Sequence, residues 1–279
     1  MNNVSITPEQ INRYKKCEND LEKLNYYFTN DEKGTAINDE SIFMKSYANL
    51  QTSFYNAINN NEYETLILLV GFSIQPLVLS TSVIKPKKVY LLFSDETSKN
   101  CNIIQSWIEK FFTAKELTAP KFIGSDSWDN NASVYKVDSS DPEDIYKKIL
   151  KIIQIEKANG KIAIDITGGK KTMVSGAFTA ASITNTDAYY VDFENYDGAN
   201  PVPGTEFLRL QKNPVDNLMT GLKSIFDEIK SQNRITKDAL EKSDEFKDVY
   251  SLLLKYEIVI DKNEYSQGDF FIHNDFQQE

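Results

Sequence analysis

Two adjacent glycines and two adjacent lysines stand between a short apolar run and a stretch of small residues, in the segment IAIDITGGKKTMVSGAF of residues 162–178. Glycine permits positive φ and close approach of a backbone, and the first N–H groups of the helix that follows would point at whatever lies there. Lys170 and Lys171 add positive charge at the same place. The segment therefore predicts an anion site that suits phosphate. The alternative is a glycine turn whose lysines are solvated.

Two common phosphate-binding motifs do not fit this segment. A Walker A loop with Gly169 and Lys170 as its G-K pair would need a glycine where Ile164 stands and a hydroxyl where Lys171 stands. A dinucleotide-binding G-x-G-x-x-G is also missing, because VGFSIQP, after the first expected strand, contains a single glycine. NTP hydrolysis and NAD binding are therefore disfavoured.

The elements around the segment alternate between short apolar runs and helical stretches. The expected strands are ETLILLVG, KKVYLLFS, SVYKVD, KIAIDIT and DAYYVDF. The expected helices are QPLVLSTSVI, KNCNIIQSWIEKFFTAK, DPEDIYKKILKIIQIEKANG and KKTMVSGAFTAASI. Because most of the strand runs are apolar on both faces, they suit a parallel sheet buried between helices. The fold class predicted is α/β, with a doubly wound, mostly parallel sheet.

This α/β domain is expected over residues 63–212, between two helical parts. Residues 1–62 form an N-terminal extension, in which Thr7 caps a helix that begins at Pro8, and Gln10 completes a capping box. Residues 213–279 form a small, mostly helical segment with 8 Lys or Arg against 14 Asp or Glu. Its last twenty or so residues could form a hairpin like that of a winged helix.

Composition excludes several function classes. The formal charge of −10 over 279 residues disfavours broad capture of DNA or RNA. No apolar run reaches the roughly 18 to 20 residues that span a bilayer, and no secretory signal is visible, so a cytoplasmic location without membrane contact is expected. Cys17 and Cys101 form no CxxC pair, and His273 is the only histidine. Neither a metal site nor a cofactor is expected.

Three loops follow expected strands at the edge where open parallel sheets bind ligands. They are VGFSIQP, FSDET and DITGGKKTM. Together with the closing strand AYYVDF, they resemble a CARF domain, the CRISPR-associated Rossmann-like sensor of type III systems, over about residues 64 to 211. The most specific element is the family's D-x-T-G-G-[T]-K-x-M turn, matched by Asp165, Thr167, Gly168, Gly169, Lys171 and Met173. Lys170 departs from it, because the family usually has Thr there.

The resemblance implies a Rossmann-like fold and a ligand, cyclic oligoadenylate, with tetra-adenylate favoured. Its ring would lie in a cleft shared by a homodimer, so that a symmetric ligand meets a symmetric interface, as part of antiviral signalling. Backbone N–H groups at the glycines would hold phosphate, with Lys171 neutralising charge. The ligand-binding residues implied are Gly71, Phe72, Ser73, Gln75, Ser94, Asp95, Glu96, Thr97, Thr167, Gly168, Gly169, Lys170, Lys171 and Met173. Asp165 is expected to orient its turn rather than to act as a base.

Other activities stay open or are disfavoured. Some CARF domains cleave their activator without metal, through attack of a ribose 2′-hydroxyl on the adjacent phosphodiester; here Lys171 and Ser73 would serve such a ring nuclease. A HEPN ribonuclease is excluded, because Gly268 stands at the arginine position of R-x-x-x-x-H. A PD-(D/E)xK nuclease is disfavoured, since both E-x-K matches lie in helical stretches. DNA binding by a transcription regulator is disfavoured by the acidic tail, and an unrelated nucleotide-binding α/β protein remains an alternative.

Overall fold

The computed structural model of this chain separates into two compact units, Met1–Gln211 and Lys212–Glu279. Each unit is described by itself. The structure describes residues 6–58, 62–124, 135–198, 200–211, 214–244, 246–255, 259, 261–266 and 269. His273 and Gly268, which were used to judge catalytic motifs, lie outside the described residues.

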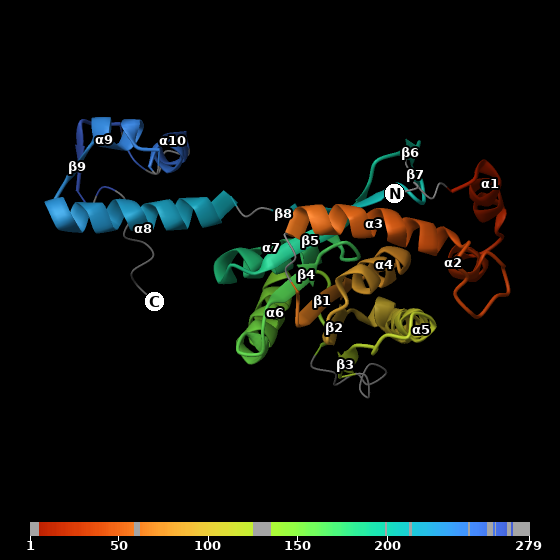
Figure 1. The fold of residues 1–279 in the computed structure, drawn as a ribbon. Helices are drawn as coiled ribbons and strands as arrows, with labels where there is room; N and C mark the ends of the chain where they lie inside the picture. Colours follow the sequence, from red (N-terminus) through yellow and green to blue (C-terminus); the bar gives the residue numbers. More distant parts are fainter. Residues whose placement is uncertain are drawn as a thin grey trace. The chain divides into compact units, whose positions relative to one another are not determined.

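The first unit is built on a six-stranded sheet with the order β3-β2-β1-β4-β5-β8 (Figure 1). Its strands are β1 (Thr65–Val70), β2 (Lys88–Phe93), β3 (Lys121–Ile123), β4 (Ile162–Asp165), β5 (Asp187–Phe193) and β8 (Glu206–Gln211). All neighbouring pairs are parallel except β5 and β8. The predicted α/β, mostly parallel fold is confirmed. Because the chain proceeds from β1 to β2 and later returns to pair β4 with β1, the strand order reverses between β1 and β4.

Helices cover both faces of this sheet (Figure 1). They are α1 (Pro8–Lys16), α2 (Asp20–Thr29), α3 (Ile42–Ile58), α4 (Gln75–Ile84), η1 (Asp95–Thr97), α5 (Ser98–Ala114), α6 (Pro142–Glu156) and α7 (Lys171–Thr184). Along β1, Leu66 and Leu68 face the layer of α3, α4 and α5, whereas Ile67 and Leu69 face α6 and α7. All six residues of β1 are buried, as expected for a central parallel strand with helices on both sides.

Two details of the sheet differ from expectation. In the stretch SVYKVD, the described residues 135–138 contribute an isolated parallel bridge between Phe93 and Lys136, and β3 takes the outer position beside β2. Strand β8 was not predicted as part of the sheet. Both added strands lie at its edges, where a short or half-exposed segment lacks the continuous apolar pattern that marks the central strands.

The N-terminal helices form a cap on the first unit, which we define as residues 6–58. Thr7 and Gln10 form the predicted capping box of α1, which ends at Lys16; α2 then begins behind a separate cap at Asn19. The cap packs on α5 through aromatic rings: Phe28 stacks on Trp107 with ring centroids 4.4 Å apart. Helix α3 also lies along β8 and α4, so the cap is part of the core of this unit.

Small strands complete the first unit: β6 (Tyr196–Asp197) pairs with β7 (Asn200–Pro201). The second unit has the order α8 (Pro214–Gln232), β9 (Ile235–Thr236), α9 (Lys237–Lys242), α10 (Lys247–Lys255) and β10 (Glu264–Tyr265). Strand β10 pairs antiparallel with β9, and the helices α9 and α10 lie between these two strands in the sequence. Much of the stretch expected to form a hairpin lies outside the described residues.

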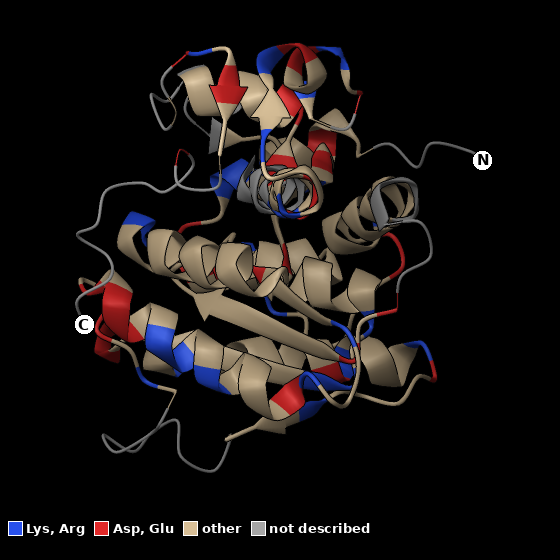
Figure 2. Cartoon of the chain, turned by 90° about the vertical axis from the view of Figure 1, so that its left-hand side faces the viewer, with Lys and Arg blue, Asp and Glu red and all other residues tan. Residues whose placement is uncertain are grey.

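Lysines among the described residues of the second unit lie beside acidic partners. Lys237 pairs with Asp261, Lys242 with Asp238, and Lys247 with Asp244. Figure 2 shows basic and acidic residues interspersed on the side of the chain in view. Among the described residues, no helix has both the length and the apolar character needed to cross a membrane.

Candidate functional site at the carboxyl edge of the sheet

The turns after β1 and β4 lie against each other, because these strands are parallel neighbours with Leu68 opposite Asp165. We call residues 165–171 the glycine turn. A Cβ placed on Gly71 would lie 1.6 Å from the carbonyl oxygen of Gly168, and one on Gly168 would lie 2.5 Å from the carbonyl oxygen of Leu69. No side chain fits at either position. The glycines therefore let two backbone segments touch at the point where the strand order reverses.

Close approach, and not positive φ, explains these glycines. Among the described residues, the glycines with φ in the left-handed region are Gly124, Gly160, Gly198 and Gly204. Of the two properties that glycine offers in this turn, the structure therefore uses close approach at Gly168 and Gly169 and not positive φ. For Gly169, a Cβ would lie 2.9 Å from Cδ1 of Leu69 and 3.1 Å from its Cβ, so a side chain there would require Leu69 of β1 to shift.

Asp165 orients the glycine turn, as predicted. Its carboxylate is buried, accepts a hydrogen bond from the backbone N–H of Thr167 at 2.8 Å, and accepts another from the hydroxyl of Ser80. Burial raises the pKa of Asp165 from 3.8 to about 6, opposed by these hydrogen bonds. The Thr167 hydroxyl oxygen in turn accepts from the N–H of Val191 at 2.9 Å. The turn is therefore held to both α4 and β5.

The two adjacent lysines have different surroundings. Nζ of Lys170 lies 2.8 Å from a carboxylate oxygen of Glu96 and 3.1 Å from the hydroxyl of Ser139. Lys171, the first residue of α7, is exposed and has no hydrogen-bond or ion-pair partner among the described residues. Of the two lysines, only Lys171 presents an unneutralised ammonium group beside the glycines.

The start of α7 also leaves backbone donors without a side-chain cap. Lys170 occupies the cap position in an extended conformation, with φ −60° and ψ 157°, and its side chain accepts no hydrogen bond from the helix. Since a lysine has no acceptor, it cannot satisfy the first N–H groups as Ser, Thr or Asp would. Uncapped N–H groups, the helix dipole and the Lys171 ammonium therefore favour an anion at the same place.

The four predicted site residues in the turn after β2 differ in burial. Ser94 and Thr97 are buried, 6 % and 2 % exposed, and form a capping box with each other. Asp95 and Glu96 are exposed, and each carboxylate pairs with a lysine: Asp95 with Lys136 and Glu96 with Lys170. These pairs reduce the negative charge that an incoming anion would meet at this edge.

The remaining predicted residues also differ in exposure. Phe72 is 69 % exposed, and Ser73 beside it is exposed without a hydrogen-bond partner among the described residues. Gln75, the first residue of α4, is half-buried. Met173 is 1 % exposed and packs in the core between the sheet and α6. An exposed aromatic ring next to the turn can stack on a base, whereas Met173 supports the turn from beneath.

Sequence reasoning missed three polar residues that shape this edge. The amide of Asn100 is buried and donates to the carbonyl of Gly71 at 2.8 Å. Ser80 donates to Asp165, and the carbonyl of Ser139 accepts from the Thr172 hydroxyl. A signal existed for Ser80, which belongs to a run of hydroxyl residues in an otherwise apolar helix, because a buried hydroxyl needs a partner. Asn100 and Ser139 gave none, since each stands among other polar residues in the sequence.

Metal-binding clusters and hollows are the other features by which a site in the described residues could be recognised. They contain no cluster of three or more His, Cys, Asp or Glu side chains that could hold a metal ion. Two hollows lie away from the glycine turn: one of about 860 Å³ against the cap, and one of about 700 Å³ at the amino ends of β4 and β5. We place the candidate site at the turns because uncapped N–H groups, an unpaired cation and close-packed glycines converge there.

Comparison with protein families gives a match over part of the chain. A family model described as "HFX_2341_N:-like, N-terminal" matches residues 64–196, slightly less than half of the chain. No curated protein matches. The matched residues lie within residues 64 to 211, for which the sequence resembles a CARF domain.

Similar solved structures include two proteins bound to cyclic nucleotides and one nuclease that a cyclic oligoadenylate activates. Csm6 of Enterococcus italicus bound to cyclic hexa-2′-fluoro-hexa-dAMP is 12 % identical with a TM-score of 0.43, and the match covers 72 % of this chain and 57 % of that one. Can2 from Sulfobacillus thermosulfidooxidans in complex with cyclic tetra-adenylate is 16 % identical with a TM-score of 0.36, covering 76 % and 61 %. A type III CRISPR defence DNA nuclease activated by cyclic oligoadenylate is 17 % identical with a TM-score of 0.35, covering 62 % and 28 %.

This chain spans less than two thirds of the length of each of these three proteins. All three TM-scores are below 0.5.

Proposed function

We propose that this chain is a type III CRISPR-associated sensor that binds cyclic oligoadenylate, with tetra-adenylate favoured, at the carboxyl edge of β1 and β4. The observation that carries the proposal is the glycine turn, residues 165–171. It matches the CARF motif, lies where the strand order reverses, and joins two close-packed backbones to an uncapped helix start. Phosphodiester groups are the anions that such a start binds most readily.

Each part of the ligand has a matching group at this edge. A phosphate would accept hydrogen bonds from the first N–H groups of α7, and the unpaired Lys171 would neutralise its charge. An adenine base would stack on the exposed ring of Phe72. Because the carboxylates of Asp95 and Glu96 are already paired, they would repel the phosphates less than bare carboxylates would.

We infer that a second copy of the chain completes the site. A ring of identical adenylates has rotational symmetry, so two copies related by a two-fold axis would offer it identical half-sites. This arrangement also explains how a chain with a formal charge of −10 could bind a polyanion, since only the shared cleft needs to be positive. We expect the homodimer to act in antiviral signalling in the cytoplasm.

The experiment is to incubate the purified protein with cyclic tetra-adenylate and cyclic hexa-adenylate without metal, and to follow binding and products by chromatography. Binding of at least one ring is expected, with a protein-to-ring ratio of two to one. Lys171→Ala should weaken binding at least tenfold, about 1.4 kcal/mol. Lys33→Ala is the matched control, because Lys33 is an exposed lysine of the cap. Failure to bind either ring would overturn the proposal.

The same experiment tests a second candidate, a ring nuclease. Ser73 and Lys171 are exposed on adjacent turns, and neither side chain has a partner among the described residues. In this reaction a ribose 2′-oxygen forms a bond to the neighbouring phosphorus while the bond to the 5′-oxygen breaks. The 5′-oxygen takes up the proton, and the other end becomes a 2′,3′-cyclic phosphate. If the wild-type protein forms a linear product and Ser73→Ala does not, the chain is a ring nuclease. If the rings stay intact with the wild-type protein, the chain is a sensor without this activity.

A further inference from the structure

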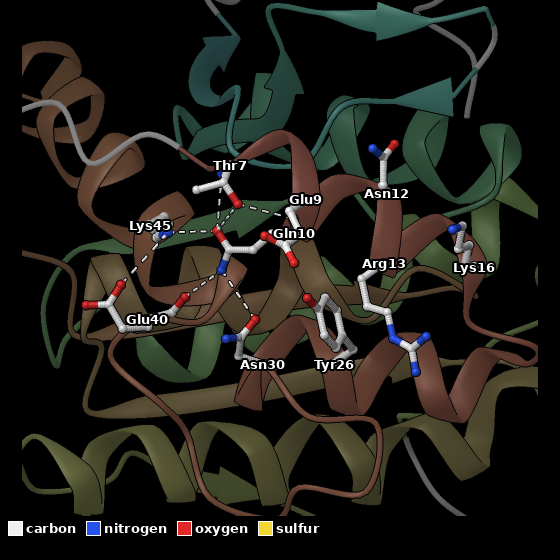
Figure 3. Close-up of a pocket in the computed structure, with 10 residues that line it drawn as sticks. All are labelled: Thr7, Glu9, Gln10, Asn12, Arg13, Lys16, Tyr26, Asn30, Glu40 and Lys45. Carbon is white, nitrogen blue, oxygen red and sulfur yellow. Dashed lines mark hydrogen bonds and ion pairs between the residues drawn. The ribbon is translucent and has the colours of Figure 1, made fainter.

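A hollow of about 860 Å³ lies in the helical cap, among α1, α2 and the start of α3 (Figure 3). We call it the cap hollow. Its lining residues are Thr7, Glu9, Gln10, Asn12, Arg13, Lys16, Tyr26, Asn30, Glu40 and Lys45. None of them belongs to the turns at the carboxyl edge of the sheet. Its volume is within the range of small-molecule sites, and its lining is dominated by charged and amide side chains.

Lys45 is the unusual member of this lining. It is 5 % exposed, and its ammonium group has one close partner, the neutral side-chain oxygen of Gln10 at 2.7 Å. The nearest carboxylate, that of Glu40, is 4.0 Å away on a side chain that is 80 % exposed. A buried ammonium carries three donors and costs free energy unless it is paired with an anion. The ammonium of Lys45 therefore lacks a close anion.

The neighbouring amide is fixed so that it cannot satisfy Lys45 further. The amide nitrogen of Gln10 donates to the carbonyl of Glu40 at 2.8 Å and to the side-chain oxygen of Asn30 at 3.3 Å. These bonds turn the Gln10 oxygen toward Lys45, as Figure 3 shows. The same oxygen also accepts from the backbone N–H of Thr7 at 3.2 Å. A built network thus holds the ammonium group in the wall of an open hollow.

The last turns of α1 add one unpaired cation to this lining. Lys16 is exposed with no partner among the described residues, whereas the guanidinium of Arg13 is already paired with Glu32. Both line the hollow, and a cation at the carboxyl end of a helix is also favoured by the helix dipole. The carboxylate of Glu9 and the phenol of Tyr26 add hydrogen-bonding groups suited to the uncharged part of a ligand, and Figure 3 shows their side chains beside Gln10.

We propose that the cap hollow is a second binding site, for a small phosphate-bearing molecule of about nucleotide size. Its phosphate pairs with the buried ammonium of Lys45, assisted by Lys16 and Arg13. Its polar remainder contacts the amides of Asn12 and Asn30. A carboxylate could meet Lys45 in the same way, so the experiment separates the two anions. The site requires no second copy of the chain.

The test measures thermal unfolding of the full chain with pyrophosphate, AMP, citrate or sodium chloride at equal ionic strength. Pyrophosphate and AMP should each raise Tm at millimolar concentration by at least about 2 °C over sodium chloride. The same rise with citrate but not with the phosphates would overturn the phosphate assignment. No rise with any of these anions would overturn the site.

Substitutions in the cap hollow show which residues cause the rise in Tm. Lys45→Met should abolish the rise in Tm and leave the ligand-free protein at least as stable, because it removes a buried charge without a close anion. Lys16→Gln should reduce the rise at least threefold, whereas the control Lys33→Met should not change it. Lys171→Ala should also keep it, which separates this site from the sheet edge. If Lys45→Met fails to fold, Lys16→Gln and Arg13→Gln decide the outcome, and an unchanged rise in both contradicts the proposal.

Discussion

The glycine turn and the cap hollow are both suited to anions, but they are built in different ways. At the glycine turn, the fit comes from backbone: two turns in contact, an uncapped helix start, and one exposed ammonium group. In the cap hollow it comes from side chains, with a buried ammonium held by an amide network. The first region should therefore be most sensitive to added volume, and the second to removed charge.

The largest expected effect is the addition of one methyl group at the glycine turn. In Gly71→Ala, the new Cβ would lie 1.6 Å from the carbonyl oxygen of Gly168, so one of the two backbones must move. We expect a loss of about 3 kcal/mol or more in the free energy of unfolding, measured by urea denaturation, and loss of binding to cyclic oligoadenylate.

Gly198→Ala is the matched glycine control. Gly198 has φ +62° and no atom within 4 Å of an added Cβ, so only the backbone conformation, worth about 1 kcal/mol, should count against it. Equal losses in the two variants would mean that contact between the turns does not explain Gly71.

The next effect compares two buried carboxyl groups by pH, Asp165 in the glycine turn and Glu206 outside both regions. Burial raises the pKa of Glu206, on β8 beneath the cap, from 4.5 to about 7, and that of Asp165 to about 6. The folded state therefore holds protons that the unfolded state has lost. The stabilisation from Glu206 is complete below pH 4.5 and disappears as the pH rises through 7, a change of about 3 kcal/mol. That from Asp165 disappears between about pH 4 and 6.

Urea denaturation at pH 5 and pH 8 measures this change. The wild-type protein should be more stable at pH 5, and Glu206→Gln should lose most of the difference, since an amide does not titrate. Asp165→Asn should alter mainly the range below pH 6. If Glu206→Gln keeps the full difference between pH 5 and pH 8, another group in the chain causes it.

A smaller effect distinguishes the two adjacent lysines. Lys171→Ala should weaken binding of cyclic oligoadenylate at least tenfold, whereas Lys170→Ala should weaken it by about threefold or less, because Glu96 already neutralises Lys170. Titration of both variants with the ring that the wild type binds measures the ratio. A larger loss in Lys170→Ala would show that the ligand displaces Glu96.

The smallest expected effect is that of Glu96→Gln. This substitution removes a carboxylate from the binding edge and releases Lys170, so binding should tighten by about two- to fivefold. Stability should change by less than about 1 kcal/mol, because both partners of the ion pair are largely exposed, 42 % and 59 %. Weaker binding in Glu96→Gln would mean that the ion pair itself shapes the site.

Much of the fold could be predicted because its signals are local. Strands β1, β2, β4 and β5 are apolar or aromatic runs, and the cap residues Thr7 and Gln10 mark the start of α1. The edge strands β3 and β8 were not predicted, since half-exposed segments look like loops. The sequence could not show which segment the glycine turn touches, because the contact between Gly71 and Gly168 joins turns far apart along the chain.

The sequence by itself determined the α/β class, the place of the glycine turn after a buried strand, and its likeness to one family's motif. Only the tertiary structure decided that Lys170 is paired and Lys171 is not, because Glu96 and Ser139 come from segments far along the chain. It alone placed the ammonium of Lys45 beside Gln10 in a hollow. Hydrophobic patterns act between near neighbours in sequence, whereas charges and hydrogen bonds are matched between residues that only folding brings together.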